Sequence, residues 1–207
     1  MIGDNIIITK KAWHDSDIIF NMLNDNFKNI VLIGGVSGSQ KSECADCLQA
    51  LLYKNGLTSF VISLDDYYKI DSWERTAWRK SNGIESVGLE EIDWIDLNRI
   101  IEDFHRKKDF HFRRIHRYAP LTEYDKANSK KIQVLIVEGL YANHLRKFHT
   151  NNLSIYLDGT PLQTLAFRQL RKKENEDDDF RQHVVQKEFN TIVQLKRYAD
   201  LIIAYEE

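Results

Sequence analysis

The stretch GGVSGSQKS at residues 34–42 contains residue types whose spacing suits phosphate binding. It follows the pattern G-x-x-x-x-G-K-[ST] at Gly35, Lys41 and Ser42, but Gln40 stands where the pattern has its second glycine. In such a loop, backbone amides and the start of the next helix face the phosphates. Lys41 would neutralise the β and γ phosphates, and the Ser42 hydroxyl would ligate Mg²⁺. The alternative is a Gly/Ser-rich turn with a surface lysine.

Gln40 determines how well this loop could bind a nucleotide. We expect the loop to contact the nucleotide through Gly35, Ser37, Gly38, Ser39, Gln40, Lys41 and Ser42. Glycine at position 40 would let the backbone approach the phosphates without a side chain in the way. Glutamine at a positive φ costs about 1 to 2 kcal/mol, whereas at a negative φ its side chain need only point outward. We therefore predict weaker or altered ATP binding rather than none.

Two carboxylates stand at the ends of apolar runs. Asp65 follows TSFVISL at 58–64, and Glu138 ends the apolar part of IQVLIVEG at 132–139. In open α/β sheets, ligands lie beyond the carboxyl ends of the strands. Asp65 could accept the proton of a hydroxyl that attacks the γ phosphate, or it could cap a helix. Glu138 could hold Mg²⁺ directly or through water, or simply end a strand.

The elements that must position these groups alternate between strands and helices. Apolar runs predict buried strands at 29–34, 58–64, 132–139, 153–159 and 200–205. Amphipathic patterns predict helices at 13–27, 42–54, 94–104, 162–170 and 180–193. Strands rich in Val, Ile and Leu that alternate with helices indicate an α/β fold with a five-stranded parallel sheet covered on both faces. The polar segments 66–93 and 105–131 are predicted to be less regular excursions on the substrate side.

Length and composition narrow the class of protein. The chain has 207 residues, 43% apolar and 29% charged, which predicts a single domain over 1–207. A formal net charge of −2 argues against a nucleic-acid partner. No apolar run approaches the roughly 20 residues that span a bilayer, and the opening MIGDNIIITKK is too weakly apolar for a signal peptide. We expect a cytoplasmic protein with a small-molecule substrate and no membrane partner, and leave open a homo-oligomer.

The two cysteines, Cys44 and Cys47, form a C-x-x-C pair that could suggest redox or metal chemistry. They share the helical spacing of Leu48, Leu51 and Leu52, which predicts one buried helix face. No second Cys or His cluster completes a zinc site. We therefore favour a role in the core.

Six stretches, in order and spacing, resemble the uridine kinase and phosphoribulokinase family of P-loop kinases. They are GGVSGSQKS, VISLDDYY, DWIDL, VLIVEGLY, SIYLDGTPLQTLAFRQLR and KRYADLII, and they cover residues 29 to 203. The resemblance implies a P-loop, nucleoside-monophosphate-kinase-like fold with a helical lid, here at about 160–185. It also implies ATP and Mg²⁺ as cofactors and a small-molecule hydroxyl as acceptor.

The resemblance also implies roles for individual residues. Lys41 and Ser42 match the loop lysine and its hydroxyl neighbour. Asp65 matches the general base, and Tyr68 matches the aromatic residue after it. The further matches are Glu138 to a magnesium-associated acid, Asp93 to an acid that contacts the acceptor sugar, and Arg168 and Arg171 to paired lid arginines that reach the phosphates. The two arginines share one helix face by spacing alone.

The sequence departs from the nucleoside kinases in two regions. Tyr118 stands near their base-contacting tyrosine, but no histidine follows at the expected place. A basic cluster occurs there instead, and in it Arg114 could bind an acceptor that carries a phosphate or carboxylate; its members are Arg113, Arg114, His116 and Arg117. The acidic run ENEDDD at 174–179 predicts no more than a solvated segment of the lid.

The leading hypothesis is an ATP-dependent kinase of a small-molecule hydroxyl, most simply that of uridine or cytidine. In it, Asp65 takes the acceptor proton while Lys41, Arg168 and Arg171 stabilise the transferred phosphoryl group. Other acceptors, such as pantothenate, glycerate or a sugar phosphate, stay open. So do a nucleotide-binding regulatory module without turnover and a protein-interaction domain on a decayed kinase fold.

Overall fold

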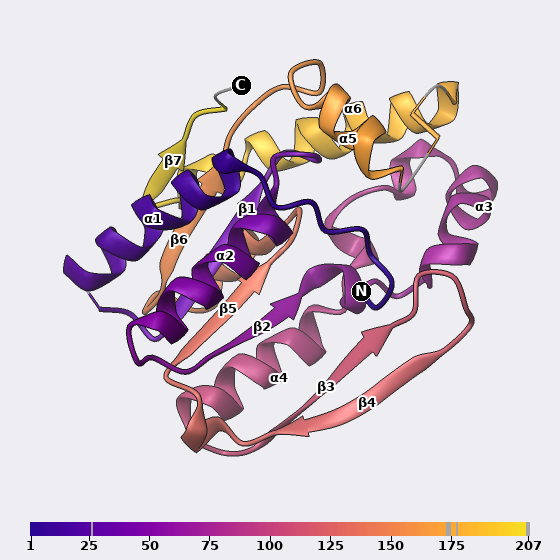
Figure 1. Ribbon diagram of the computed structural model, residues 1–207. Helices are drawn as coiled ribbons and strands as arrows, with labels where there is room; N and C mark the ends of the chain where they lie inside the picture. The colour runs from indigo at the N-terminus through magenta and orange to yellow at the C-terminus, as the bar shows by residue number, and fades with distance from the viewer. Residues whose placement is uncertain (26, 173–174, 177, 206–207) are drawn as a thin grey trace.

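The computed structural model describes residues 1–25, 27–172, 175–176 and 178–205, and its centre is a five-stranded sheet (Figure 1). Every neighbouring pair of strands is parallel, and the order is β2-β5-β1-β6-β7. The strands are β1 (Ile30–Gly35), β2 (Ser59–Ser63), β5 (Val134–Glu138), β6 (Leu153–Leu157) and β7 (Leu201–Ile203). All five strands coincide with predicted apolar runs, which confirms the α/β prediction.

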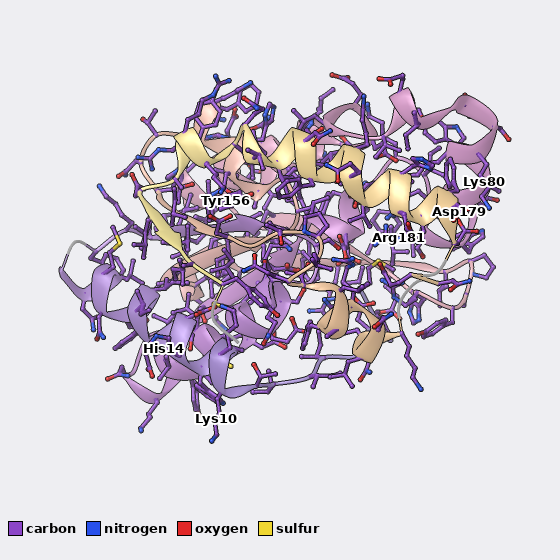
Figure 2. All side chains as sticks on the ribbon, turned by 90° about the horizontal axis from the view of Figure 1, so that it is seen from above. Lys10, His14, Lys80, Tyr156, Asp179 and Arg181 are labelled. Atoms are coloured by element: carbon purple, nitrogen blue, oxygen red, sulfur yellow. The ribbon has the colours of Figure 1, made fainter. Side chains whose placement is uncertain are left out.

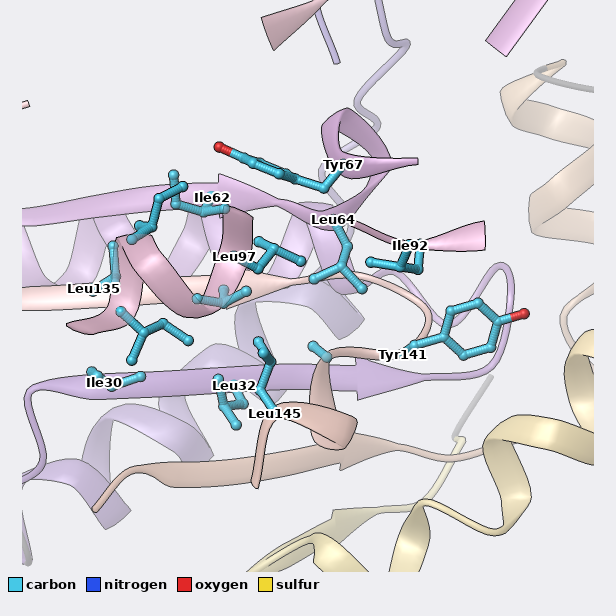
Figure 3. Close-up of a cluster of buried hydrophobic side chains, with 14 of the residues drawn as sticks. Ile30, Leu32, Ile62, Leu64, Tyr67, Ile92, Leu97, Leu135, Tyr141 and Leu145 are labelled. Atoms are coloured by element: carbon cyan, nitrogen blue, oxygen red, sulfur yellow. The ribbon is translucent and has the colours of Figure 1, made fainter. Parts of the chain in front are cut away.

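Helices cover both faces of this sheet because alternate strand residues are apolar on each side. Val31 and Ile33 face α1 (Lys10–Asp25) and α2 (Lys41–Lys54), which pack side by side. Ile30 and Leu32 face the opposite cluster, which contains α4 (Trp94–His105) and the end of α6 (Asp179–Val193). Figure 3 shows this second cluster between β1, β2 and α4. The two clusters of buried apolar side chains thus fix the positions of the carboxyl ends of the strands.

The segments predicted to be irregular contain regular structure. Residues 66–93 include α3 (Ser72–Asn82), and residues 105–131 form an antiparallel hairpin of β3 (Phe110–Ile115) and β4 (Thr122–Ala127). The hairpin lies on the β2 side of the molecule, where Phe60 packs edge-on against Phe110 and Phe112 (Figure 1). The buried Asp66 carboxylate accepts the Ile115 amide at 2.9 Å and holds the hairpin to the end of β2.

Short helical segments complete the chain. The lid contains α5 (Leu165–Arg171) and the start of α6. The 3-10 turns are η1 (Leu64–Tyr67), η2 (Ile84–Ser86), η3 (Leu89–Glu91), η4 (Ser129–Lys131), η5 (Ala142–Lys147) and η6 (Lys196–Tyr198). Within the described ranges, no helix combines the length and apolar character needed to cross a bilayer.

The C-x-x-C pair belongs to the core, as predicted. Cys44 and Cys47 are buried free thiols on the inner face of α2. Burial raises the pKa of both, that of Cys47 to about 11, so neither thiol is activated near neutral pH. The residues that the structure describes contain no cluster of three metal-ligating side chains.

Candidate active site

The loop between β1 and α2 forms one wall of a cavity at the carboxyl edge of the sheet. Ser37, Gly38, Lys41 and Ser42 line it. Gly38 has φ +83°, and a Cβ placed on it would lie 2.7 Å from Cγ of Arg168. Glycine is therefore required there on two grounds, conformation and close approach by the lid.

Gln40 adopts a left-handed backbone conformation. Its φ of 69° and ψ of 34° are left-handed, as glycine would favour, at a cost of about 1 to 2 kcal/mol. The side chain points away from the cavity, and its amide oxygen accepts a hydrogen bond from the Thr9 hydroxyl. Helix α2 still begins at Lys41, and Cys44 donates to the Gln40 carbonyl at 2.8 Å. Gln40 therefore leaves the phosphate side of the loop open.

Lys41 is held inside the loop by burial and by a backbone contact. Its Nζ donates to the Val36 carbonyl at 2.7 Å. Burial lowers the pKa of Lys41 to about 8, although Glu138 and Asp65 act in the opposite direction. An ammonium held in so dry a position gains much from a phosphate beside it, because water no longer screens the attraction.

Ser42 and Glu138 meet as the predicted Mg²⁺ pair. The Ser42 hydroxyl donates to Glu138 Oε2 at 3.2 Å, and the Ser63 hydroxyl donates to Oε1 at 2.5 Å. Parallel pairing places Glu138 beside both Ile33 and Ser63, which explains why these side chains converge. Burial, followed by the charge of Asp65, raises the pKa of Glu138. One carboxylate with one hydroxyl fits Mg²⁺, which takes its remaining oxygens from water and phosphate.

Asp65 and Tyr68 enter the same cavity from the turn after β2. Asp65 lies in η1, on the side of Lys41 and Glu138, whose pKa values its charge raises. The N-cap position of η1 is Ser63, so Asp65 is not the helix cap that the alternative interpretation required. Tyr68 is buried, and its ring face carries the Arg75 guanidinium at 3.6 Å.

The paired lid arginines also line the cavity. Arg168 Nε donates to Glu176 at 2.8 Å, and its Nη1 donates to Thr164 Oγ1 at 2.7 Å. Arg171 Nε lies 3.4 Å from the fully buried Glu43 carboxylate of α2. Ion pairs with carboxylates thus hold the guanidinium groups of Arg168 and Arg171 in the cavity that the phosphate loop lines.

The acidic run at 174–179 is more than a solvated segment. Glu176 is buried between Arg168 and Arg181, and Asp178 caps α6 by accepting the Arg181 amide at 2.8 Å. The expectation of solvation was therefore wrong for Glu176, because its charge is balanced by two arginines. Residues 174 and 177 of the run lie outside the described residues.

Sequence reasoning missed the cavity wall that α3 supplies. Arg75 and Arg79 lie four residues apart on one face of α3, and both line the cavity. Arg79 is buried and paired with Glu91 at 2.7 Å and with Glu188 of α6 at 3.3 Å. Figure 2 shows the same junction at the surface, where Lys80 of α3 lies beside the start of α6. The i, i+4 arginines after the Asp71-Ser72 capping signal were the available clue.

Three predicted acceptor contacts do not reach this cavity. Asp93 caps α4 by accepting the Asp96 amide at 3.1 Å, and Tyr118 is 77% exposed. Arg114 lines a neighbouring cavity behind Ser42 and Glu138 instead.

The basic cluster around Arg114 also divides, because successive hairpin residues face opposite sides. Arg113 lies 3.8 Å from Asp93, and His116 lies 2.7 Å from Glu123. Arg117 pairs with Asp4 and is the one member of the cluster that lines the cavity.

A second cavity adjoins the phosphate loop on the side of Gln40. It lies between the start of α1 and the end of β7, and its lining includes Thr9, His14, Gln40, Ile203 and Tyr205. Figure 2 shows Lys10 and His14 on α1 at this end of the molecule, away from the start of α6. The phosphate loop thus lies between two cavities, one lined by Lys41 and Ser42 and the other by Gln40.

A phosphate loop on a parallel sheet, facing two carboxylates and a helical lid with arginines, defines a P-loop kinase. Residues 30–203 match the model of the phosphoribulokinase / uridine kinase family, and the chain belongs to this family. The fold and the comparisons together place it among the small-molecule kinases.

Comparisons with known proteins agree with this family assignment, and the matched proteins are named for different substrates. The bifunctional alpha-galactosidase/sucrose kinase AgaSK of Mediterraneibacter gnavus is 26% identical over 94% of this chain, which spans 22% of that protein. A structure named as a putative fructose transport system kinase, from Silicibacter sp. TM1040, has a TM-score of 0.65 at 17% identity, with 94% of this chain and 100% of that chain covered. One named as a possible uridine kinase, from Bacillus stearothermophilus, has 0.60 at 15% identity, with 92% and 97% covered.

A structure named as a D-glycerate 3-kinase has the same fold. The D-glycerate 3-kinase of Cryptococcus neoformans var. grubii has a TM-score of 0.59 at 12% identity, with 94% of each chain covered. Likeness at this level of identity shows the shared fold alone.

Proposed function

We propose that this chain transfers the γ phosphoryl group of ATP to a hydroxyl of a small, highly polar molecule. The observation that carries the proposal is the convergence of Lys41, Ser42, Asp65, Glu138 and Arg171 on one cavity. These residues come from four separate segments of the chain, which are brought together by the strand order and the lid. A charged set of this kind can hold phosphates, a divalent ion and an attacking hydroxyl at once.

Each residue has a role that its position suits. Lys41 binds the phosphates of the donor, and Ser42 with Glu138 would hold Mg²⁺, which supplies charge neutralisation between the phosphates. Asp65 accepts the proton of the acceptor hydroxyl. Arg168 and Arg171 exchange their carboxylate partners for phosphate oxygens as the transferred group develops charge. The cavity beside Gln40, which Leu201, Ile203 and Tyr205 line in part, would receive the base of the donor.

The lining favours a sugar-like acceptor over the nucleoside that the sequence resemblance suggested. Among the described residues that line the cavity, Tyr68 is the one aromatic side chain, and Arg75 covers its ring. A nucleobase has no other aromatic face there, and Asp93 and Tyr118 lie elsewhere. The charged side chains that line the cavity can donate to and accept from the hydroxyl groups of a carbohydrate. Two of the similar proteins are named for sucrose and fructose.

The test is ADP release with MgATP against fructose, sucrose, uridine, cytidine, glycerate, pantothenate and ribulose 5-phosphate. With an accepted substrate, Asp65→Asn should lower kcat by about 10² to 10⁴, because the general base is lost. The affinity of the Asp65→Asn variant for MgADP should stay within about twofold of the wild-type value, since Asp65 is assigned to the acceptor. Lys41→Ala should lose both binding and turnover. Tight MgATP binding with no turnover on any acceptor would favour a regulatory module instead.

A second candidate is a kinase whose acceptor carries a phosphate or carboxylate, and Arg75 favours it. Its Nη2 is buried without a hydrogen-bond partner in the described part of the chain, whereas Arg79, one turn later, is paired with two carboxylates. Stacking on Tyr68 fixes the plane of the Arg75 guanidinium. An anionic group on the acceptor would complete this arrangement.

Matched acceptors test this second candidate. Fructose and fructose 6-phosphate, or glycerol and glycerate, differ in the anionic group. If the acceptor is anionic, Arg75→Gln should raise KM for the charged member about tenfold or more and leave KM for MgATP unchanged. A preference for the neutral member in the wild-type chain would exclude this candidate.

A further inference from the structure

The Gln40 side chain joins the phosphate loop to the N-terminal helix. Its amide oxygen accepts from the Thr9 hydroxyl, and that hydroxyl in turn accepts the Ala12 amide at 3.1 Å. The Thr9 oxygen therefore uses its proton on Gln40 and a lone pair on the first turn of α1. One threonine thus caps α1 and holds the loop residue that precedes Lys41.

The conformation of Gln40 explains why such a contact would matter. Three non-glycine residues in the described ranges have a positive φ, and two of them, Lys107 and Lys172, follow the ends of helices. Gln40 alone of the three is buried, at 5% exposure, and it directly precedes a helix. A side chain that is fixed at its far end limits the backbone angles that the residue can adopt. The contact thus compensates for the absent glycine.

We propose that the hydrogen bond between Thr9 and Gln40 is a tether that positions the phosphate loop for the donor nucleotide. Gln40 and Thr9 are positioning residues, and they act through the amides around Lys41 rather than by touching the transferred group. The tether makes the start of α1 part of the nucleotide site, although Thr9 precedes Gln40 by 31 residues in sequence. This inference rests on the proposed function, since it assigns the loop to a nucleotide.

A double-mutant cycle tests the tether. Gln40→Met keeps the length of the side chain and removes its hydrogen bond, and Thr9→Val removes the hydroxyl. Each single change should raise Kd for MgADP roughly two- to tenfold. Kd of the double variant should not exceed the larger of the two single-variant values, because both changes remove the same contact. KM for MgATP should rise in parallel while kcat changes less than about twofold.

Two further variants serve as controls. Thr9→Ser keeps the hydroxyl and should bind like the wild-type chain. Gln40→Gly restores the residue that adopts a positive φ without strain, so it should bind MgADP at least as well as the wild-type chain, and adding Thr9→Val to it should change Kd little. A loss of binding on adding Thr9→Val to Gln40→Gly as large as that in the wild-type chain, or effects of Gln40→Met and Thr9→Val that add fully, would overturn the proposal.

Amide hydrogen exchange separates the tether from the proposed function. In the ligand-free chain, residues 36–44 should exchange faster in Gln40→Met and in Thr9→Val than in the wild-type chain. Failure of the wild-type chain to bind MgADP would refute the proposed function, and the exchange measurement would still decide the tether. Unchanged exchange in both variants would refute the tether.

Discussion

At the scale of single residues, the site depends on charges kept from water. Lys41, Glu138, Glu43 and Arg168 are all buried or nearly so, and each lies within reach of an opposite charge. Interactions of this kind are strong because solvent does not screen them, and the charge state of each member then controls its partners.

Lys41 gives a pH dependence with a definite sign. Burial lowers its pKa to about 8, so the free site loses its ammonium as pH rises through 8, whereas bound phosphate favours the charged form. The affinity for MgADP should therefore fall roughly tenfold for each pH unit above 8. Titration calorimetry from about pH 7 to about pH 9.5 measures this. Lys41→Met should bind weakly at every pH, and a wild-type Kd that stays constant over this range would contradict the assignment.

At the scale of elements, the cavity is built by packing α3 and the lid against the edge of the sheet. Arg79 of α3 lies between Glu91 of η3 and Glu188 of α6, and Glu91 also accepts the Gly88 amide at 2.9 Å. One buried guanidinium thereby joins three segments of the chain.

Removing this guanidinium should loosen the cavity wall that α3 supplies. Arg79→Met leaves the buried Glu91 carboxylate without its cation and Glu188 with the more distant Arg181, at 3.8 Å, so the free energy of unfolding should fall by about 3 to 5 kcal/mol. Chemical denaturation followed by circular dichroism measures the loss. The neighbouring exposed Lys80, 3.6 Å from Asp178, is the matched control, and Lys80→Met should change stability by less than about 0.5 kcal/mol. A loss below about 1 kcal/mol for Arg79→Met would show that the pair is not essential.

At the scale of the whole molecule, nucleotide binding and folding are coupled. The cavity lining extends from Ser37 to Glu188, so the site exists only in the folded chain. A ligand that binds the folded state alone stabilises it by mass action, by about 2.7 kcal/mol at about 100 times Kd.

That coupling predicts a thermal shift that needs no knowledge of the acceptor. MgADP at about 100 times Kd should raise Tm by about 5 to 11 °C for a chain of this size. Differential scanning calorimetry measures it, and Lys41→Ala should remove it. A wild-type Tm that does not move with millimolar MgADP would argue for a fold that no longer binds nucleotide.

Much of the fold follows from local pattern. Val31 and Ile33 alternate with Ile30 and Leu32 in a run apolar on both faces, which is why β1 could be predicted as a buried parallel strand. The polar helix α3 and the hairpin were missed, because SWERTAWRKSN has few apolar positions and Arg114 stands where the alternation in FHFRRI would place an apolar residue. Their stability comes from tertiary contacts between residues far apart in sequence, such as Arg79 with Glu188 for α3 and Phe112 with Phe60 for the hairpin.

The sequence by itself determined the phosphate loop and the two carboxylates: Lys41 and Ser42 begin the helix after β1, Asp65 and Glu138 stand at the ends of β2 and β5, and parallel strands bring their carboxyl ends to one edge. Only the tertiary structure decided the cavity walls that α3 and the lid supply and the conformation of Gln40. Arg75, Glu176 and Thr9 reach the site from segments whose approach depends on how helices and loops pack. The physical reason is range: strand periodicity and loop spacing are encoded within a few residues, whereas charge pairing and backbone conformation at the loop depend on partners far away in the chain.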